Sequence, residues 1–399
     1  MPATLHHEPV LNVTVVTETY PPEVNGVAMT LGRMVDGLLG LGHRIHLVRP
    51  RQGPADRPTR RDRYAEQLVA GLPLPPYPGL RLGLPAGRLL EAQWRKTRPD
   101  VVQVVTEGPL GASAVAAAQR LGIPVVSEFH TNFPAYSRHY GFGWLETLVT
   151  AHLRRMHNRS RLTLVPTRSL AEELAGKGYR NLRVVSRGID TGLFNPCRRS
   201  AALRAQWGVA DDAPVVAYVG RIAAEKNLPL VLDCHARIAA ELPAARLLLV
   251  GDGPLRATLA QRHPQHLYAG MRRGEDLAAH YASADLFLFP SVTETFGNVT
   301  AEALASGLPV VAYRCAAAAE LIRDGHNGIA VPPGDAPAFV RSALDLLRDR
   351  AALWRMRGEA AASVAHLHWD AVNRSLVAAL REAIAASPDA LPQDGLTDS

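Results

Sequence analysis

The chain has 399 residues, of which 47% are hydrophobic and 20% are charged. This length exceeds that of one ordinary domain, and the apolar fraction excludes a globally disordered chain, so we expect two domains of similar size. The formal net charge is +7, and no apolar run reaches the ~18–20 residues that cross a bilayer. The N-terminus carries no basic-then-apolar signal pattern, so we expect a cytoplasmic protein, either soluble or peripheral on the inner face of the plasma membrane.

The first half alternates short apolar runs with amphipathic segments. We expect strands at residues 11–17, 46–48, 100–105, 125–129 and 162–166, a turn-rich stretch at 18–26 and a helix at 30–41. Such alternation predicts a parallel sheet covered by helices on both faces. Residues 51–83 differ, because they are rich in Pro, Gly and Arg without a clear period. They predict an exposed insertion with little regular structure.

The second half restarts the same pattern. Strands are expected at residues 214–220, 246–251, 267–270, 286–290, 308–313 and 329–331, and helices at 228–240, 275–283 and 299–306. We divide the chain into two domains, 1–195 and 196–369, followed by a helix at 370–386 and a disordered tail at 387–399. Two doubly wound α/β domains facing each other form a cleft, and ligands bind such sheets at the carboxyl ends of their strands.

The most specific string runs from Pro290 to Pro309, where a strand ends, a loop turns and a helix begins. The free amides of Asn298 and Val299 would stand at the positive end of a helix dipole, which suits a diphosphate. Glu294 and Glu302, with seven residues between them, can accept hydrogen bonds from sugar and ribose hydroxyls. Acidic residues near a helix N-terminus occur in proteins of many kinds, but the whole string is too specific for that explanation.

A second cluster, G-R-I-A-A-E-K-N at residues 220–227, follows the first strand of the second half. Arg221 and Lys226 lie on either side of a turn, so both can reach one anion. An ordinary solvated loop is the alternative. Only three of the 44 basic residues are lysines, and a lysine at this place indicates that a compact ammonium is required.

Three weaker features also follow strands. Gly26, in Y-P-P-E-V-N-G-V, would let the backbone approach phosphate or sugar closely, although turn glycines are common. His130, in S-E-F-H-T-N-F, lies in the basic half, and a lone histidine is more often structural than catalytic. Gly251 and Gly253, in G-D-G-P, fail as a dinucleotide fingerprint because G-x-G-x-x-G is incomplete.

Together these strings resemble glycosyltransferase family 4, a group of retaining enzymes with the two-domain GT-B fold. The family signature E-x-F-G-x-x-x-x-E-A-x-A-x-G-x-P-V is matched at Glu294, Phe296, Gly297, Glu302, Ala303, Ala305, Gly307, Pro309 and Val310. The G-R-x-x-x-E-K-N, G-x-G-P and H-T strings match as well. The resemblance runs from residue 13 to about residue 380. One departure is that this chain has Asn25-Gly26 where the family often has two glycines.

The resemblance implies a role for each matched residue. Glu294 would contact the transferred sugar and Glu302 the nucleotide ribose. Arg221 and Lys226 would neutralise the leaving diphosphate, so that neither a metal nor another cofactor is required, and His130 would line the reacting face of the donor sugar. We therefore predict the catalytic residues His130, Arg221, Lys226 and Glu294. The predicted donor-binding residues are Gly26, Gly220, Gly251, Gly253, Phe296, Gly297, Asn298, Val299 and Glu302.

The resemblance also implies front-face transfer from a nucleotide-sugar, closure of the two domains around the donor, and a C-terminal helix that crosses back to the first domain. The strings are most similar to bacterial enzymes that glycosylate lipids, including GDP-mannose-dependent mannosyltransferases. We favour GDP-mannose as the donor, with UDP-sugars left open. Two alternatives remain at this point: a nucleotide-sugar epimerase on the same scaffold, and a non-catalytic protein that binds sugar nucleotides or lipids.

Charge is distributed unevenly along the chain. Residues 1–195 hold 24 basic and 15 acidic residues, whereas residues 196–399 hold 20 and 22. A basic half favours an anionic partner, and no nucleic-acid motif accompanies the charge. We expect an anionic membrane surface and a lipid- or polyprenyl-linked acceptor, because Arg57, Arg60, Arg61 and Arg63 can reach outward from the insertion. The basic helix expected at 88–98 can lie in the interface or pack its leucines on the sheet.

Overall fold

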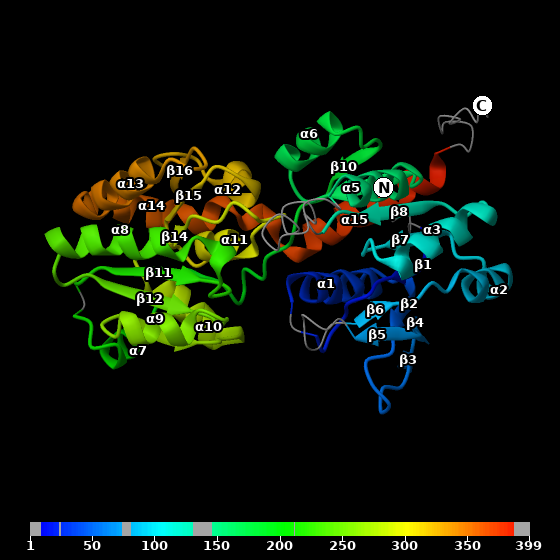
Figure 1. The fold of residues 1–399 in the computed structure, drawn as a ribbon, viewed down its shortest axis with the longest axis horizontal. Helices are drawn as coiled ribbons and strands as arrows, with labels where there is room; N and C mark the ends of the chain where they lie inside the picture. Colours follow the sequence, from blue (N-terminus) through cyan, green and yellow to red (C-terminus); the bar gives the residue numbers. More distant parts are fainter. Residues whose placement is uncertain (1–8, 24, 74–80, 131–145, 211, 387–399) are drawn as a thin grey trace, which may run out of the picture.

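The computed structural model describes residues 9–23, 25–73, 81–130, 146–210 and 212–386. Two sheets, one in each half of the chain, organise these residues (Figure 1). The first has eight strands in the order β10-β9-β8-β7-β1-β2-β4-β3, and the second has six in the order β13-β12-β11-β14-β15-β16. Within these two sheets, strand pairing is parallel except between β3 and β4. The two doubly wound α/β domains predicted from the sequence are therefore confirmed.

The first sheet and its connections use the first half of the chain. Its strands are β1 (Asn12–Val16), β2 (Arg44–Pro50), β3 (Arg60–Arg61), β4 (Tyr64–Val69), β7 (Val101–Val104), β8 (Val125–Glu128), β9 (Leu162–Val165) and β10 (Leu182–Val184), and a separate hairpin joins β5 (Gly71–Pro73) to β6 (Arg81–Gly83). The helices are α1 (Gly26–Gly40), α2 (Gly87–Thr97), α3 (Pro109–Arg120), α5 (Glu146–Asn158) and α6 (Arg168–Gly176). Strands β7 and β8 are buried at every position, because helices cover both faces of a parallel sheet.

The second half repeats this plan around the second sheet. Its strands are β11 (Val215–Val219), β12 (Arg246–Val250), β13 (Leu267–Gly270), β14 (Leu286–Phe289), β15 (Val310–Tyr313) and β16 (Gly328–Val331). The helices are α7 (Ala201–Gln206), α8 (Leu228–Glu241), α9 (Arg256–Arg262), α10 (Gly274–Ser283), α11 (Asn298–Ala305), α12 (Ala316–Leu321), α13 (Ala336–Arg348) and α14 (Arg350–Ser363), with short 3₁₀ turns at η2 (Pro196–Arg198), η3 (Ala224–Lys226) and η4 (Ala365–Leu367). Asp335 and Asp349 cap α13 and α14 through side-chain hydrogen bonds to backbone amides.

The last helix, α15 (Trp369–Ala385), packs against the first domain. Its residues Val372, Leu376 and Leu380 belong to the same hydrophobic core as Val13 and Leu31. Figure 1 shows this orange-red to red helix running from the middle of the molecule into the first half, whereas α13 lies in the second half. The chain therefore passes between the halves twice. The exact domain limits, residues 195 and 369, stay predictions, and the tail 387–399 lies outside the described residues.

The prediction of little regular structure for residues 51–83 is wrong. Strand β4 extends the first sheet by pairing in parallel with β2. Only its first and last residues, Tyr64 and Val69, are buried, so this strand near the sheet edge lacks the apolar run by which strands are recognised. Ion pairs supply part of its attachment: Arg49 of β2 contacts Glu66 of β4 at 2.9 Å and Asp56 at 2.7 Å.

The basic helix α2 packs its apolar side on the first domain. Leu90 and Trp94 are completely buried in the core that covers one face of the sheet. Of the three large apolar side chains on this helix, Leu89, Leu90 and Trp94, only Leu89 remains exposed, with 52% of its surface accessible. Of the two interpretations open from the sequence, packing on the sheet is the one that the structure shows.

Candidate active site

The loops after β11 and β14 bring two predicted catalytic residues into contact. These strands are neighbours in the sheet, so their carboxyl ends lie side by side. Lys226, in η3, donates a hydrogen bond from Nζ to Oε1 of Glu294, and the Oγ of Ser291 donates to the same oxygen at 2.7 Å. The side chains of Lys226 and Glu294 are 12% and 18% exposed. They form a partly buried ion pair that stays open on one side.

Helix α11 begins directly after this pair. Its N-cap is Gly297, which adopts a left-handed conformation with φ of 87° and provides no side-chain cap. Among the described residues, the amides of Asn298 and Val299 donate no hydrogen bond. The free N–H groups of Asn298 and Val299 thus follow directly after the loop that holds the Lys226 ammonium through Glu294. Such a group of donors suits a phosphate or diphosphate. Phe296 is buried in the core of the second domain, so its side chain fixes the loop between β14 and α11 to that domain.

Glu302 lies within α11 and is held by a tyrosine that the sequence did not single out. The hydroxyl of Tyr281, on α10, donates to Oε2 of Glu302 at 3.0 Å. Burial raises the pKa of Glu302 to about 7, and the hydrogen bond from Tyr281 opposes that rise. The carboxyl group therefore changes its ionisation close to neutral pH. A tyrosine on the buried side of a helix is indistinguishable in the sequence from an ordinary core residue, so Tyr281 gave no signal.

Arg221 occupies a more exposed position than Lys226. Its guanidinium is 3.3 Å from Oε1 of Glu225, and 43% of its side chain is accessible. Glu225 is itself buried, so it holds one side of the guanidinium while the rest of the group remains accessible. No direct contact joins Arg221 to Glu294 within the described residues.

Gly251 and Gly253, in the G-D-G-P string, lie where the loop after β12 packs against the loop after β11, and the contact leaves no room for a Cβ atom. A Cβ at Gly251 would lie 2.0 Å from the carbonyl oxygen of Gly220, and a Cβ at Gly253 would lie 2.4 Å from that of Ile222. The amide of Ile222 also donates to the carbonyl oxygen of Asp252 at 2.9 Å. These glycines therefore fix the shape of the loops that carry Arg221, whatever they contact in the donor.

Gly26 is the first residue of α1, which begins four residues earlier than predicted because Asn25 caps it. The side chain of Asn25 accepts from the amide of Ala28 at 2.8 Å. No described atom lies within 4 Å of a Cβ placed at Gly26. The chain itself thus imposes no steric demand for glycine here, which leaves the space to solvent or a ligand.

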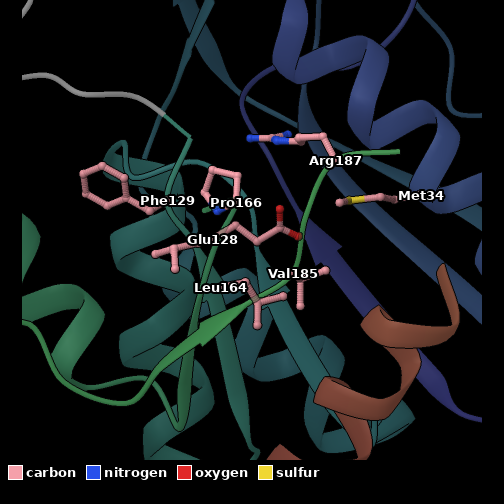
Figure 2. Close-up of a pocket in the computed structure, with 8 residues that line it drawn as sticks. Met34, Glu128, Phe129, Leu164, Pro166, Val185 and Arg187 are labelled. Carbon is pink, nitrogen blue, oxygen red and sulfur yellow. The ribbon is translucent and has the colours of Figure 1, made fainter. Parts of the chain in front are cut away.

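His130 lies in the other domain, after β8. Its Nε2 is 2.5 Å from Oε2 of Glu128, and its Nδ1 is 2.6 Å from a guanidinium nitrogen of Arg187. A small cavity of about 10 Å³ borders Glu128 and Arg187 (Figure 2), which is room for about one water and not for a sugar. Contact between His130 and the Lys226–Glu294 pair is absent from the described part of the chain, and Thr131 of the same string lies outside it.

Among the described residues, no group of three or more His, Cys, Asp or Glu side chains is arranged to hold a metal ion. Likewise, none of the helices in that part of the chain is long and apolar enough to span a membrane.

Comparison with known proteins agrees with this geometry. The models for "Glycosyltransferase Family 4" and "Glycosyl transferases group 1" match residues 24–193 and 213–349. A GDP-mannose-dependent alpha-mannosyltransferase of Mycobacterium tuberculosis is 34% identical over 82% of this chain and 85% of its own length. This chain belongs to the family 4 glycosyltransferases. Family 4 membership makes it a retaining hexosyltransferase that uses a nucleotide-sugar donor, which decides against the epimerase and the non-catalytic binding protein.

This family 4 chain is also similar to a lipid glycosyltransferase and to a solved structure. The alpha-monoglucosyldiacylglycerol synthase of Acholeplasma laidlawii is 25% identical over 80% of this chain and 84% of its own length. Among solved structures, sucrose-phosphate synthase from Thermosynechococcus elongatus superposes with a TM-score of 0.76 at 18% identity, covering 94% of this chain and 99% of that one. The last likeness confirms the GT-B fold.

Proposed function

We propose that this glycosyltransferase transfers mannose from GDP-mannose to a lipid-linked acceptor without a metal ion. The observation that carries the proposal is the Lys226–Glu294 pair at the start of α11, beside the free amides of Asn298 and Val299. The mannose and the lipid are supported by the similar proteins, one named for GDP-mannose and another for a diacylglycerol product.

In this proposal the leaving diphosphate is stabilised by fixed positive charge. Lys226, Arg221 and the amides of α11 face the departing phosphate oxygens, where such groups have their largest effect on the rate. Glu294 holds a hydroxyl of the transferred sugar, and Glu302 holds the ribose. The bond from C1 to the phosphate oxygen breaks as the acceptor oxygen bonds to C1 from the same face. The leaving phosphate takes the acceptor proton, so that charge and protons balance.

The donor is the part of the proposal that a binding experiment tests most simply. GDP-mannose should raise the melting temperature of the protein more than UDP-glucose at equal concentration, because at a given concentration the tighter ligand stabilises the folded state more. A larger shift with a UDP-sugar would replace GDP-mannose by that donor and leave the proposed reaction unchanged.

Activity should persist in EDTA. Because Lys226 and Arg221 supply positive charge at the diphosphate, we expect initial rates with and without EDTA to agree within about twofold, a difference of ~0.4 kcal/mol in the barrier. The measurement is release of nucleoside diphosphate under saturating acceptor. Complete loss of activity in EDTA, with recovery on adding magnesium or manganese, would contradict metal-independent transfer.

The first domain should bind anionic membranes through an arginine cluster, defined as Arg57, Arg60, Arg61 and Arg63. All four arginines are exposed, and each basic group near an anionic surface contributes about 1 kcal/mol. In flotation assays the protein should rise with phosphatidylserine vesicles, less so at high salt, and hardly at all when the cluster is changed to serine.

A matched variant changes four exposed arginines of the second domain to serine: Arg237, Arg262, Arg341 and Arg355. It removes the same charge and should float like the unmodified protein. Equal recovery with neutral and anionic vesicles, or equal losses in both variants, would contradict docking through the cluster and favour a soluble acceptor.

A further inference from the structure

Four side chains from three strands and their loops form a hydrogen-bonded series inside the first domain. Arg187, after β10, contacts Nδ1 of His130 at 2.6 Å, and Nε2 of His130 contacts Glu128 at 2.5 Å. The other oxygen of Glu128 accepts from the amide of Gln103 on β7. The His130 and Glu128 side chains are 1% and 5% exposed, and Arg187 is buried as well.

The chemistry of these groups fixes the protonation of the histidine. A guanidinium has donors only, so Nδ1 of His130 must accept from Arg187. Nε2 then carries the proton and donates it to the carboxylate of Glu128. The imidazole is therefore neutral and held at both nitrogens, between a buried cation and a buried anion. Removing either partner would leave an unpaired charge in the interior.

Among the described residues, Glu107 is a further charged group close to the histidine. Glu107, after β7, lies with Oε1 3.4 Å from the amide of His130 and 3.7 Å from Nε2 of His157 on α5. Burial and the positive charge of Arg187 lower the pKa of His130, whereas Glu128 and Glu107 oppose that change. Burial also lowers the pKa of Arg187, to about 10, which still leaves the guanidinium charged at neutral pH.

Arg187 directly precedes the place where the chain crosses between the domains. Ile189 pairs with His368 in a parallel bridge, and its amide donates to the carbonyl oxygen of Leu367 at 2.8 Å. Gly188 lies so close to Trp369 that a Cβ there would be 2.3 Å from the ring. In Figure 2 the Arg187 guanidinium and the Glu128 carboxylate border the same small cavity, with Met34 of α1 opposite. Arg187 therefore lies next to backbone that is fixed by contacts with residues 367–369.

We infer that Arg187 and Glu128 are positioning residues that keep His130 neutral and fixed in one orientation during glycosyl transfer. His130 then acts as a fixed, neutral group after β8 and not as an acid or a base, since neither ring nitrogen is free to exchange a proton with substrate. This inference rests on the proposed function together with the family resemblance, which implies that His130 lies beside the donor sugar.

The test follows the imidazole by ¹⁵N NMR in histidine-labelled enzyme, with the His130 signals assigned by their loss in His130→Gln. In the unmodified enzyme we expect the neutral tautomer with the proton on Nε2, and a pKa for His130 below the ordinary value of a histidine. In Arg187→Met the histidine should gain a proton at higher pH than before, because the neighbouring cation is gone. Arg187→Lys keeps a cationic donor and should restore the neutral form at least in part.

Kinetics supply the second measurement. Arg187→Met should lower kcat by roughly 10- to 100-fold, the range for a displaced group at a reacting centre, with little change in the KM for the donor. Its kcat should fall further as the pH is lowered and the imidazolium accumulates, whereas Arg187→Lys should have a flatter profile. A general loss of fold would lower the melting temperature without creating this new pH dependence.

Several outcomes would overturn the inference. One is an imidazolium, or the Nδ1–H tautomer, at pH 7 in the unmodified enzyme, which needs no variant to detect. Another is an Arg187→Met protein that folds and shows the same His130 titration and the same pH profile as the original. The NMR result is independent of turnover, so it stands apart from a failure of the proposed donor or acceptor, which would appear as lack of product from the unmodified enzyme.

Discussion

Lys226→Ala should lower turnover about 10²-fold or more, the loss expected when a major stabiliser of transition-state charge is removed. Lys226 reaches Glu294 within a partly buried pair, next to the free amides of α11. Its removal takes away a cation at the leaving group and also leaves the Glu294 carboxylate without its partner. Lys226→Arg should recover little of the activity, because a planar guanidinium differs in shape and donor geometry from the compact ammonium that contacts Glu294.

Lys177→Ala is the matched control. This lysine also pairs with a carboxylate, Glu173, but on the exposed surface of α6 with 45% of its side chain accessible. It should change neither turnover nor donor affinity by more than about twofold, in line with the small energies of exposed ion pairs. Turnover of Lys226→Ala within threefold of the control would contradict a role for Lys226 at the diphosphate.

Glu294→Gln and Glu302→Gln should fail in different ways. Glu294 is tied to Lys226 and Ser291 at the reacting end of the site, so its amide variant should lower kcat roughly 10- to 100-fold with little effect on nucleotide affinity. Glu302 lies deeper, against Tyr281, and its variant should weaken nucleotide binding about tenfold, which corresponds to ~1.4 kcal/mol for a hydrogen bond to a charged group. Calorimetric titration and initial rates separate the two effects.

The Glu302 carboxyl also predicts a pH dependence. Burial raises its pKa to about 7 in the free enzyme, and the ionised form is the better acceptor for ribose hydroxyls. Donor affinity should therefore increase as the pH rises through about 7, and this increase should be lost in Glu302→Gln. Normal binding of GDP and UDP by Glu302→Gln would show that Glu302 does not hold the ribose.

The sequence was enough to predict the central strands of both sheets, because these strands are buried on two faces and appear as apolar runs. Strands β3, β4 and β10 escaped prediction because they lie at or near the edges of the first sheet, and β4 is attached partly by the ion pairs of Arg49. The contact between Lys226 and Glu294 could be expected only through family resemblance, since 67 residues separate them and their approach depends on β11 and β14 being neighbours.

The residues that hold the predicted site residues in place could not be predicted either, because their contacts also depend on the three-dimensional arrangement of the strands and helices. Ser291, Tyr281, Glu128 and Arg187 contact the predicted site residues through pairings set by strand order and helix rotation. Their residue types are common on strand ends and buried helix faces, so no spacing in the sequence marks them. Phe296 shows the converse case, because a residue in the family signature turns out to be a core side chain.

Retaining transfer from a nucleotide-sugar is tested most directly by the anomeric configuration of the product. The enzyme would be incubated in EDTA with ¹³C-labelled GDP-mannose, with and without vesicles containing diacylglycerol and anionic phospholipid, and the products followed by NMR. We predict an α-linked mannolipid and an equal amount of released GDP, neither of which forms without the vesicles. A β-linked product, or an altered sugar still attached to GDP in the absence of acceptor, would contradict retaining transfer.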